Sequence, residues 1–279
     1  MDGEPGRCGA GVQPRRLTSP GCGSGLDSLE RRVRLPSRAC GFLPMNYLPF
    51  RLLNDRDTFW GLLWSRRLSG SDLLRLMVFI MVACGVYGAI MAGWRSPRLS
   101  LYVAIKLPLL FLATTAFVSV FNWMLGLVFR TGLDFRTTIW MVFSAMTLAS
   151  WILISLAPVS LLFMLSGVPA LGTEAELQYA HNGILVTHIL VLALSGVSAL
   201  WVLREGLVRL AAPGCPVGLV LLTWIGMFAF VGCQMGWILR PFVGSPFYPV
   251  AFMRPDCLER NFYEFVFGEV MPYLLQGGR

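Results

Sequence analysis

Four polar side chains lie in or at the ends of long apolar runs, where a polar group needs a partner. They are Lys106, His188, Gln234 and Arg240. Two are cations, one is a histidine and one is an amide, so together they offer hydrogen-bond donors to an anion. Ionisable side chains inside membrane segments are rare and commonly mark function. Secondary candidates for the same kind of site are Asn122, Arg254 and Asn261.

These polar groups can lie at one membrane level. With the N-terminus inside, Lys106, His188, Gln234 and Arg240 all fall near the outer ends of their spans, which predicts a shared site for an anion or a lipid headgroup. The alternative is that they act separately. Lys106 and Arg240 then extend to the interface, Gln234 and Asn122 bond neighbouring helices, and His188 is a packing histidine.

Composition indicates a membrane protein. The chain of 279 residues is 56% hydrophobic and only 14% charged, whereas a soluble domain carries about a quarter charged residues. Its net charge of +8 comes from arginines scattered between apolar runs, so nucleic-acid binding is not expected. Two histidines and no C-x-x-C pair argue against a metal site. No catalytic motif or cofactor motif is present, so no catalytic residue is assigned and a non-enzymatic role is favoured.

Five apolar runs are long enough to cross a bilayer, which takes about 20 residues. The sequence therefore predicts an all-α integral membrane protein with a bundle of about five transmembrane helices. The runs lie at 76–94, 107–129, 137–173, 183–203 and 217–239. The third run is too long for one untilted helix. It predicts a long helix kinked at Pro158, with a re-entrant piece through Gly167-Val-Pro169, or a split into two spans and six in all, as alternatives.

The segments outside the spans are of a different kind. Residues 1–44 are rich in Gly, Pro, Ser and Arg, and are expected to be either a disordered basic tail that touches anionic lipid or mis-called sequence upstream of a start at Met45. Residues 45–72 form a juxtamembrane segment, 73–240 the five-helix domain and 241–279 a tail at the membrane surface. Trp60 and Trp64, four residues apart, predict an interfacial helix at the N-terminal end. A short amphipathic helix at 256–267 is the expected counterpart in the tail.

Several motifs resemble a family of uncharacterised bacterial multi-span membrane proteins. They are Ala104-Ile-Lys-Leu-Pro-Leu-Leu-Phe-Leu112, Phe121-Asn122, Leu156-Ala-Pro-Val-Ser160, Gly232-x-Gln234-x-x-Trp237-x-Leu-Arg-Pro-Phe-x-Gly-x-Pro246, Phe252-x-Arg254 and Asn261-Phe-Tyr263. The resemblance covers about residues 45–266 and is most specific at 232–246. That family is grouped with the five-span Yip type, whose eukaryotic members act in vesicle trafficking with Rab GTPases. The resemblance implies a five-span layout and no activity, substrate or catalytic residue.

The basic N-terminal flank and the acidic third loop predict a cytoplasmic N-terminus, and the resemblance implies the bacterial inner (plasma) membrane. Two functions fit. The first is a non-enzymatic role in membrane organisation or partner binding, with the lipid bilayer and either a membrane-protein partner or a second copy as partners. The second is a small transporter or channel for an anionic or lipid-like solute, using the four polar residues. A polar cavity lined by those four would favour the second.

Overall fold

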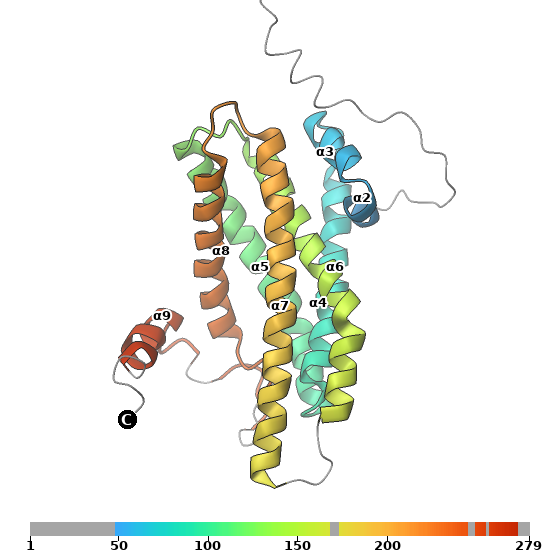
Figure 1. Cartoon of the computed structure of the whole chain (residues 1–279), viewed down its shortest axis with the longest axis vertical. Helices are drawn as coiled ribbons and strands as arrows, with labels where there is room; N and C mark the ends of the chain where they lie inside the picture. The colour runs from blue at the N-terminus through green and yellow to red at the C-terminus, as the bar shows by residue number, and fades with distance from the viewer. Residues whose placement is uncertain (1–47, 168–172, 245–248, 255–256, 273–279) are drawn as a thin grey trace, which may run out of the picture. The chain divides into compact units, whose positions relative to one another are not determined.

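The structure is a computed structural model that describes residues 48–167, 173–244, 249–254 and 257–272. These ranges are helical with connecting turns, and they contain no β-strand. The segment 1–44 lies outside the described residues. The helices are α2 (Leu48–Asn54), α3 (Arg56–Trp64), α4 (Gly70–Gly93), α5 (Pro97–Val128), α6 (Phe135–Gly167), α7 (Glu174–Leu210), α8 (Val217–Leu239), α9 (Phe262–Phe265) and the π-helix η1 (Val266–Val270) (Figure 1).

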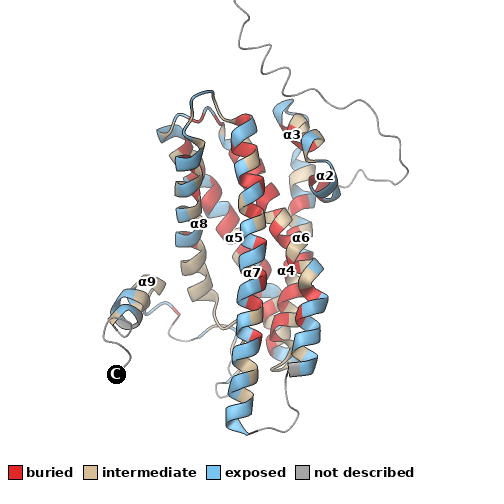
Figure 2. Ribbon diagram, viewed as in Figure 1, coloured by how far each residue is buried: buried red, intermediate tan, exposed pale blue. Residues whose placement is uncertain are grey.

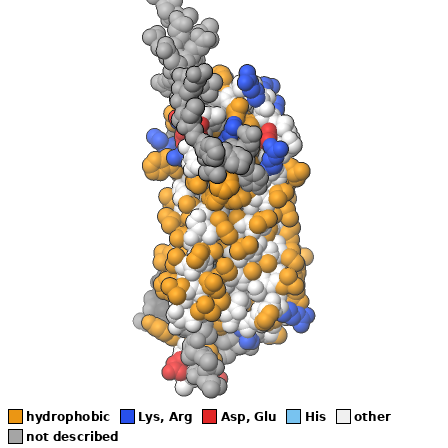
Figure 3. All heavy atoms as spheres, turned by 90° about the vertical axis from the view of Figure 1, so that its right-hand side faces the viewer, with side chains coloured by type: hydrophobic (Ala, Val, Ile, Leu, Met, Phe, Trp, Pro, Cys, Tyr) orange, Lys and Arg blue, Asp and Glu red, His pale blue; other side chains and the backbone are white. Residues whose placement is uncertain are grey.

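Helices α4 to α8 are each long and apolar enough to cross a membrane, which confirms the predicted helical membrane class and the count of five among the described residues. The runs at 183–203 and 217–239 lie within α7 and α8, those at 76–94 and 107–129 end one residue beyond α4 and α5, and the run at 137–173 extends past the end of α6. Figure 2 shows buried residues gathered between these helices. On the face drawn in Figure 3, hydrophobic side chains cover the middle and charged side chains gather towards the two ends. Such a band is expected where a bundle meets hydrocarbon, because only internally hydrogen-bonded backbone is stable there.

The third apolar run forms one helix. α6 continues from Phe135 to Gly167 with Pro158 inside it, so the alternative of two spans in this run is wrong. A proline removes one backbone hydrogen bond, and a long helix packed among others tolerates that loss. The re-entrant alternative includes residues 168 and 169, which lie outside the described residues.

Small residues bring the backbones of α4 and α5 together. Pro108 has no N–H to donate to the carbonyl of Ala104 in the preceding turn. That carbonyl faces Gly85, where a Cβ would lie 3.2 Å from its oxygen. At Gly88 a Cβ would lie only 2.6 Å from the carbonyl oxygen of Val103. Glycine at these positions therefore sets the distance between the two helices.

We expect Gly88→Ala to lower the free energy of unfolding of the purified protein by about 1–3 kcal/mol. The added methyl group must push the backbones of α4 and α5 apart. Gly196→Ala in α7 is the matched control, since nothing lies within 4 Å of a Cβ there. That change should be neutral or stabilising by up to about 1 kcal/mol through helix propensity. Equal shifts of the unfolding midpoint in detergent would contradict the close packing.

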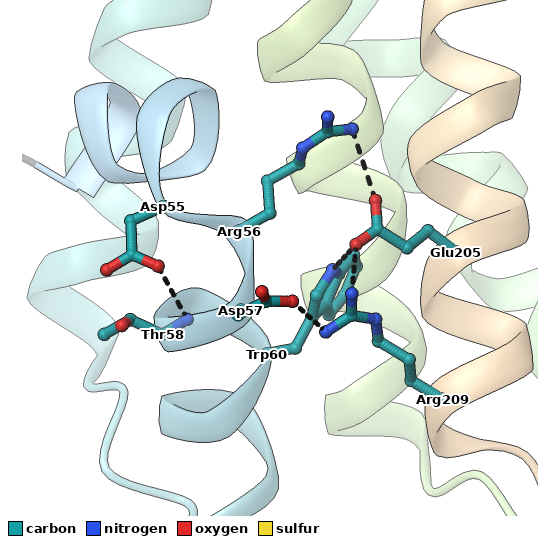
Figure 4. Close-up of polar contacts among 7 residues, drawn as sticks. All are labelled: Asp55, Arg56, Asp57, Thr58, Trp60, Glu205 and Arg209. Carbon is teal, nitrogen blue, oxygen red and sulfur yellow. Dashed lines mark hydrogen bonds and ion pairs between the residues drawn. The ribbon is translucent and has the colours of Figure 1, made fainter. Parts of the chain in front are cut away.

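Helix α3 is held on the end of α7 by a polar network (Figure 4). The carboxylate of Glu205 accepts the indole N–H of Trp60 and the guanidinium of Arg56, both at 3.2 Å. Arg209 lies 2.9 Å from Glu205 and 2.5 Å from Asp57. This end of the bundle is called the α3 end below. Two basic and two acidic side chains therefore form ion pairs with one another in this network.

The two tryptophans of α3 do not share an environment. Trp60 is 3% exposed, whereas Trp64 is 53% exposed. Gly206 makes room for Trp60, since a Cβ there would lie 2.7 Å from the indole ring. α3 is thus a helix docked against the bundle, and its predicted position on the membrane surface stays a prediction.

Asp134 connects the start of α6 to the segment after α3. One carboxylate oxygen accepts the backbone N–H of Thr137 at 3.1 Å and also its hydroxyl, and the other lies 3.2 Å from a guanidinium nitrogen of Arg66. Partial burial acts to raise the pKa of Asp134, but the hydrogen bonds from Thr137 and the charge of Arg66 outweigh it, so the pKa is lowered.

Because the pKa of Asp134 is lower in the folded state, its ionised form stabilises the fold above the ordinary value of 3.8. That contribution is lost as the pH falls through the folded-state pKa. Asp134→Asn should therefore reduce the melting temperature at neutral pH, and its difference from the parent protein should shrink as the pH approaches 3. Glu259→Gln, at an exposed position in the tail, is the control and should show no such convergence.

Candidate functional site

At the end of the bundle away from α3, the ends of α4, α7 and α8 meet, and this end is called the cavity end below. Trp94, the residue after α4, is central to it. Its ring lies 5.4 Å from that of His181 near the start of α7. Its indole N–H donates to the carbonyl of Val243, beyond the end of α8, at 2.9 Å. One side chain thus joins three segments that are far apart in sequence.

The chain turns sharply after α8. Arg240 has φ −58° and ψ 153°, and α8 ends at the residue before it, as expected for a residue that precedes proline. The carbonyl of Pro241 then accepts a hydrogen bond from Nζ of Lys106 at 3.2 Å. Gly244 has φ +76°, which favours glycine, and a Cβ there would also lie 2.5 Å from the side chain of Leu99. The turn at Arg240 and Pro241, called the break below, therefore brings the chain back against α5.

Farther along, the tail folds against α8. The indole N–H of Trp237 donates to the carbonyl of Arg260 at 2.7 Å, and the amide oxygen of Gln234 accepts the backbone N–H of Phe262 at 3.1 Å. Both contacts use side chains that precede the break, so the end of α8 holds the returning tail.

The helix predicted at 256–267 begins later than expected. Residues 255 and 256 lie outside the described residues, and α9 starts at Phe262 with Asn261 as its N-cap. The side-chain oxygen of Asn261 accepts the backbone N–H of Glu264 at 2.8 Å, and Glu264 accepts the backbone N–H of Asn261 at 3.1 Å. This reciprocal pair is a capping box, so Asn261 has a structural role at the start of α9.

A cavity of about 390 Å³ lies between these segments. Its basic side chains come from the turn after α4, from α7, from the end of α8 and from the tail. They are Arg95, His181, Arg240 and Arg254. The rest of the described lining is apolar or backbone, and no carboxylate is found in it. Three of these four side chains are arginines, which carry a positive charge at neutral pH.

Lys106 lies behind one wall of this cavity. It is fully buried, and its ammonium group contacts the carbonyl of Pro241, which lines the cavity, and lies 4.9 Å from the ring centroid of Phe252. The guanidinium carbon of Arg240 lies 3.4 Å from the ring centroid of Trp237, a cation–π geometry that fixes its position. Lys106 is thus buried, Arg240 is half-buried and Arg254 is exposed.

The structure brings together only part of the predicted four-residue site. Lys106 and Arg240 meet at the wall formed by Pro241. Gln234 is engaged with the tail, and His188 is buried and bonded through Nδ1 to the hydroxyl of Tyr87 at 2.8 Å. Neither of these two lines the cavity. Anion binding by any of the four stays a prediction.

The secondary candidates separate in the same way. Arg254 lines the cavity. Asn122 is buried in α5, and its two amide atoms have no hydrogen-bond partner in the part of the chain that the structure describes. It lies outside the cavity lining, and it is not assigned to the site.

Arg95 and His181 line the cavity but were not predicted. Arg95 directly follows the first apolar run at 76–94, which gives no signal for a site. His181 was placed before the fourth span, whereas α7 begins seven residues earlier at Glu174. His181 lies in the part of α7 that precedes the apolar run. The apolar run alone therefore does not predict that His181 is helical.

Comparison of the chain with protein-family models, with curated proteins and with solved structures finds no match. The chemistry of the site therefore rests on its geometry. Within the described ranges, no group of three or more His, Cys, Asp or Glu side chains is placed to hold a metal ion.

Tyr87 is the residue that satisfies His188. Its hydroxyl also lies 3.4 Å from the hydroxyl of Ser160, which can donate to it. Tyr87→Phe should lower stability by about 1 kcal/mol, because it leaves two buried polar groups of neighbouring helices without this partner. The measurement is thermal unfolding in detergent. Tyr179→Phe removes the hydroxyl of a side chain that is 84% exposed and should change nothing. If both variants unfold like the parent protein, His188 does not depend on Tyr87.

Proposed function

We propose that the protein is a non-enzymatic integral membrane protein that binds an anionic group, of the phosphate or carboxylate type, in the cavity at one end of its bundle. The observation that carries this proposal is the lining of the cavity. Three arginines from three separate segments line one space.

Arginine chemistry supports this ligand class. A guanidinium group has five N–H donors in a planar arrangement that matches carboxylate and phosphate oxygens. Arg95, Arg240 and Arg254 also have contacts within the chain. A guanidinium that has one partner retains further donors, so an anion would add to these contacts.

Lys106 adds to the same field. Its ammonium group has three donors, and a carbonyl oxygen and an aromatic ring are the contacts described for it. Both are neutral, so they orient the charge without cancelling it. A buried cation normally requires a nearby negative charge. An anion in the adjacent cavity would supply that charge.

The geometry favours binding over transport. The described cavity lies at one end of the bundle, and His188 and Gln234 are used in contacts that hold helices and tail together. A protein that holds anionic groups at one membrane surface fits a role in membrane organisation or partner binding. Transport of an anionic or lipid-like solute is the second candidate, supported by the buried polar side chains of α5, α6 and α7.

The setting completes the proposal. The basic flank before α4 supports a cytoplasmic N-terminus, and in this proposal the α3 end is inside and the cavity end is outside. The resemblance of several motifs to a bacterial multi-span family supports the bacterial inner membrane and a Yip-like layout in this proposal. A membrane-protein partner or a second copy remains part of this proposal.

The test is binding of dihexanoyl phosphatidic acid, a short-chain anionic lipid, to the full chain purified in detergent. Arg95→Gln should weaken binding by at least about tenfold. This is the loss of affinity expected when one hydrogen bond from a charged group is removed.

The matched control is Arg98→Gln. Arg98 lies three residues after Arg95, in the first turn of α5. It is exposed, and its Nε donates to the hydroxyl of Tyr102 at 2.8 Å. This variant should bind like the parent protein. Absence of binding, or equal loss in both variants, would contradict the cavity as the site.

A further inference from the structure

The short helix α2 is attached to the bundle by a residue from the interior of a span. α2 contacts α4 and α6 (Figure 1), and its buried side chains are Leu48, Pro49 and Leu52. The carbonyl of Pro49 accepts the indole N–H of Trp151 in α6 at 3.1 Å. The ring of Phe50 lies 4.9 Å from that of Trp151. Trp151 therefore sets the level at which α2 begins.

Trp151 lies well inside the apolar part of α6. The last charged residue before it in that helix is Arg136, fifteen positions earlier, which corresponds to about 22 Å of helix. The side chain of Trp151 leans back towards the α3 end, as helical side chains do, but its ring is still next to that of Phe79 in α4, at 4.6 Å. Trp151 and Phe79 both belong to the apolar runs of their spans. The start of α2 is thus level with residues that cross hydrocarbon.

The end of α2 leads to polar groups instead. Asn54 is its last residue and is exposed, and Asp55 is the N-cap of α3. Arg56 then pairs with Glu205, which follows the apolar run of α7. Within the length of α2, the chain therefore passes from the apolar level of two spans to the polar network of the α3 end. Arg51 has a contact within the chain, and its long side chain can extend towards that polar end.

The composition of α2 suits an apolar surrounding. Pro49 has no N–H, so the first turn contains one fewer donor that needs a partner. On its outer side, Leu53 is 43% exposed. α4, which α2 contacts, also has large apolar side chains on its outer surface, and Val82 is 61% exposed. Apolar surface of this kind is stabilised when hydrocarbon covers it.

We propose that α2 enters the hydrocarbon of the membrane leaflet at the α3 end, with Leu48–Phe50 deepest and Asn54 at the level of the headgroups. Acyl chains then cover the outer side of α2, so the partner of this surface is lipid hydrocarbon. Contact with hydrocarbon does not depend on headgroup charge, so the depth is the same in neutral and anionic membranes. The inference is independent of the proposed function, because the cavity lies at the other end of the bundle.

The experiment measures the depth of spin labels in the full chain, reconstituted into phosphatidylcholine vesicles. Labels are attached to single cysteines introduced by Phe50→Cys and Asn54→Cys, in a chain whose native cysteines are replaced by alanine. The two positions are about one turn apart on the same side of α2. Oxygen concentrates in hydrocarbon and a nickel chelate stays in water, so the ratio of their collision rates with a label reports its depth. Each labelled chain is first shown to unfold like the parent protein.

Two further positions serve as references. Val82→Cys marks the hydrocarbon, and Arg67→Cys, in the exposed segment between α3 and α4, marks the aqueous side. The oxygen-to-nickel ratio at position 50 should be close to that at 82 and several-fold higher than that at 67, and it should fall from 50 to 54. Leu53→Cys tests the same gradient without disturbing the contact between Phe50 and Trp151. Its ratio should lie between those at 50 and 54.

Three results would overturn the proposal. A ratio at 50 and 53 equal to that at 67 would place α2 in water. Low collision rates with both reagents at 50 and 53 would show that protein covers α2, from a second copy or from another part of the chain. A high ratio at 50 that appears only in phosphatidylglycerol vesicles would mean that headgroup charge, and not hydrocarbon, holds α2 at the membrane. Equal ratios in the two kinds of vesicle are the expected result.

Discussion

The hydrogen bond between Lys106 and the carbonyl of Pro241 is the contact around which the cavity end is built. Lys106 is the single lysine of the sequence and is fully buried in the helix bundle. An ammonium group without a hydrogen-bond acceptor is costly there. Most helical carbonyls already accept a backbone N–H, so a carbonyl outside a helix is a more available acceptor. The break at Arg240 and Pro241 releases one. The same turn brings Val243 to Trp94 and Gly244 against Leu99, so satisfying one cation also forms a wall of the cavity.

The charged side chains at the two ends of the bundle are arranged differently. At the α3 end, Glu205 accepts from Arg56, Trp60 and Arg209, and Arg209 also pairs with Asp57. This network fixes α3 on α7. At the cavity end, the described lining gathers arginines without carboxylates. The α3 end thus uses ion pairs to dock a helix, whereas the cavity end brings arginines from separate segments to one space.

The apolar runs were sufficient to predict the five helices, since hydrocarbon permits few alternatives to a hydrogen-bonded helix. They gave the bounds of α8 to the residue, because proline lies at both of its ends. They placed the start of α7 too late, because Glu174 and Glu176 begin the helix outside the apolar run. His181 was missed for this reason. The pairing of His188 with Tyr87 depends on how α4 and α7 pack, which span periodicity leaves open.

The motif at 232–246 shows why a site and a structural feature are hard to separate in a membrane protein. Gln234 and Trp237 hold the returning tail, Pro241 ends α8 and accepts from Lys106, and Gly244 permits the close approach to Leu99. Each of these residues has a structural contact, and only Arg240 also places charge in the cavity. A motif can thus contain many specific residues because the chain must turn at a membrane surface. What makes this turn a candidate site is that the segments it joins contribute arginines and aliphatic walls to one space, a combination that packing alone does not require.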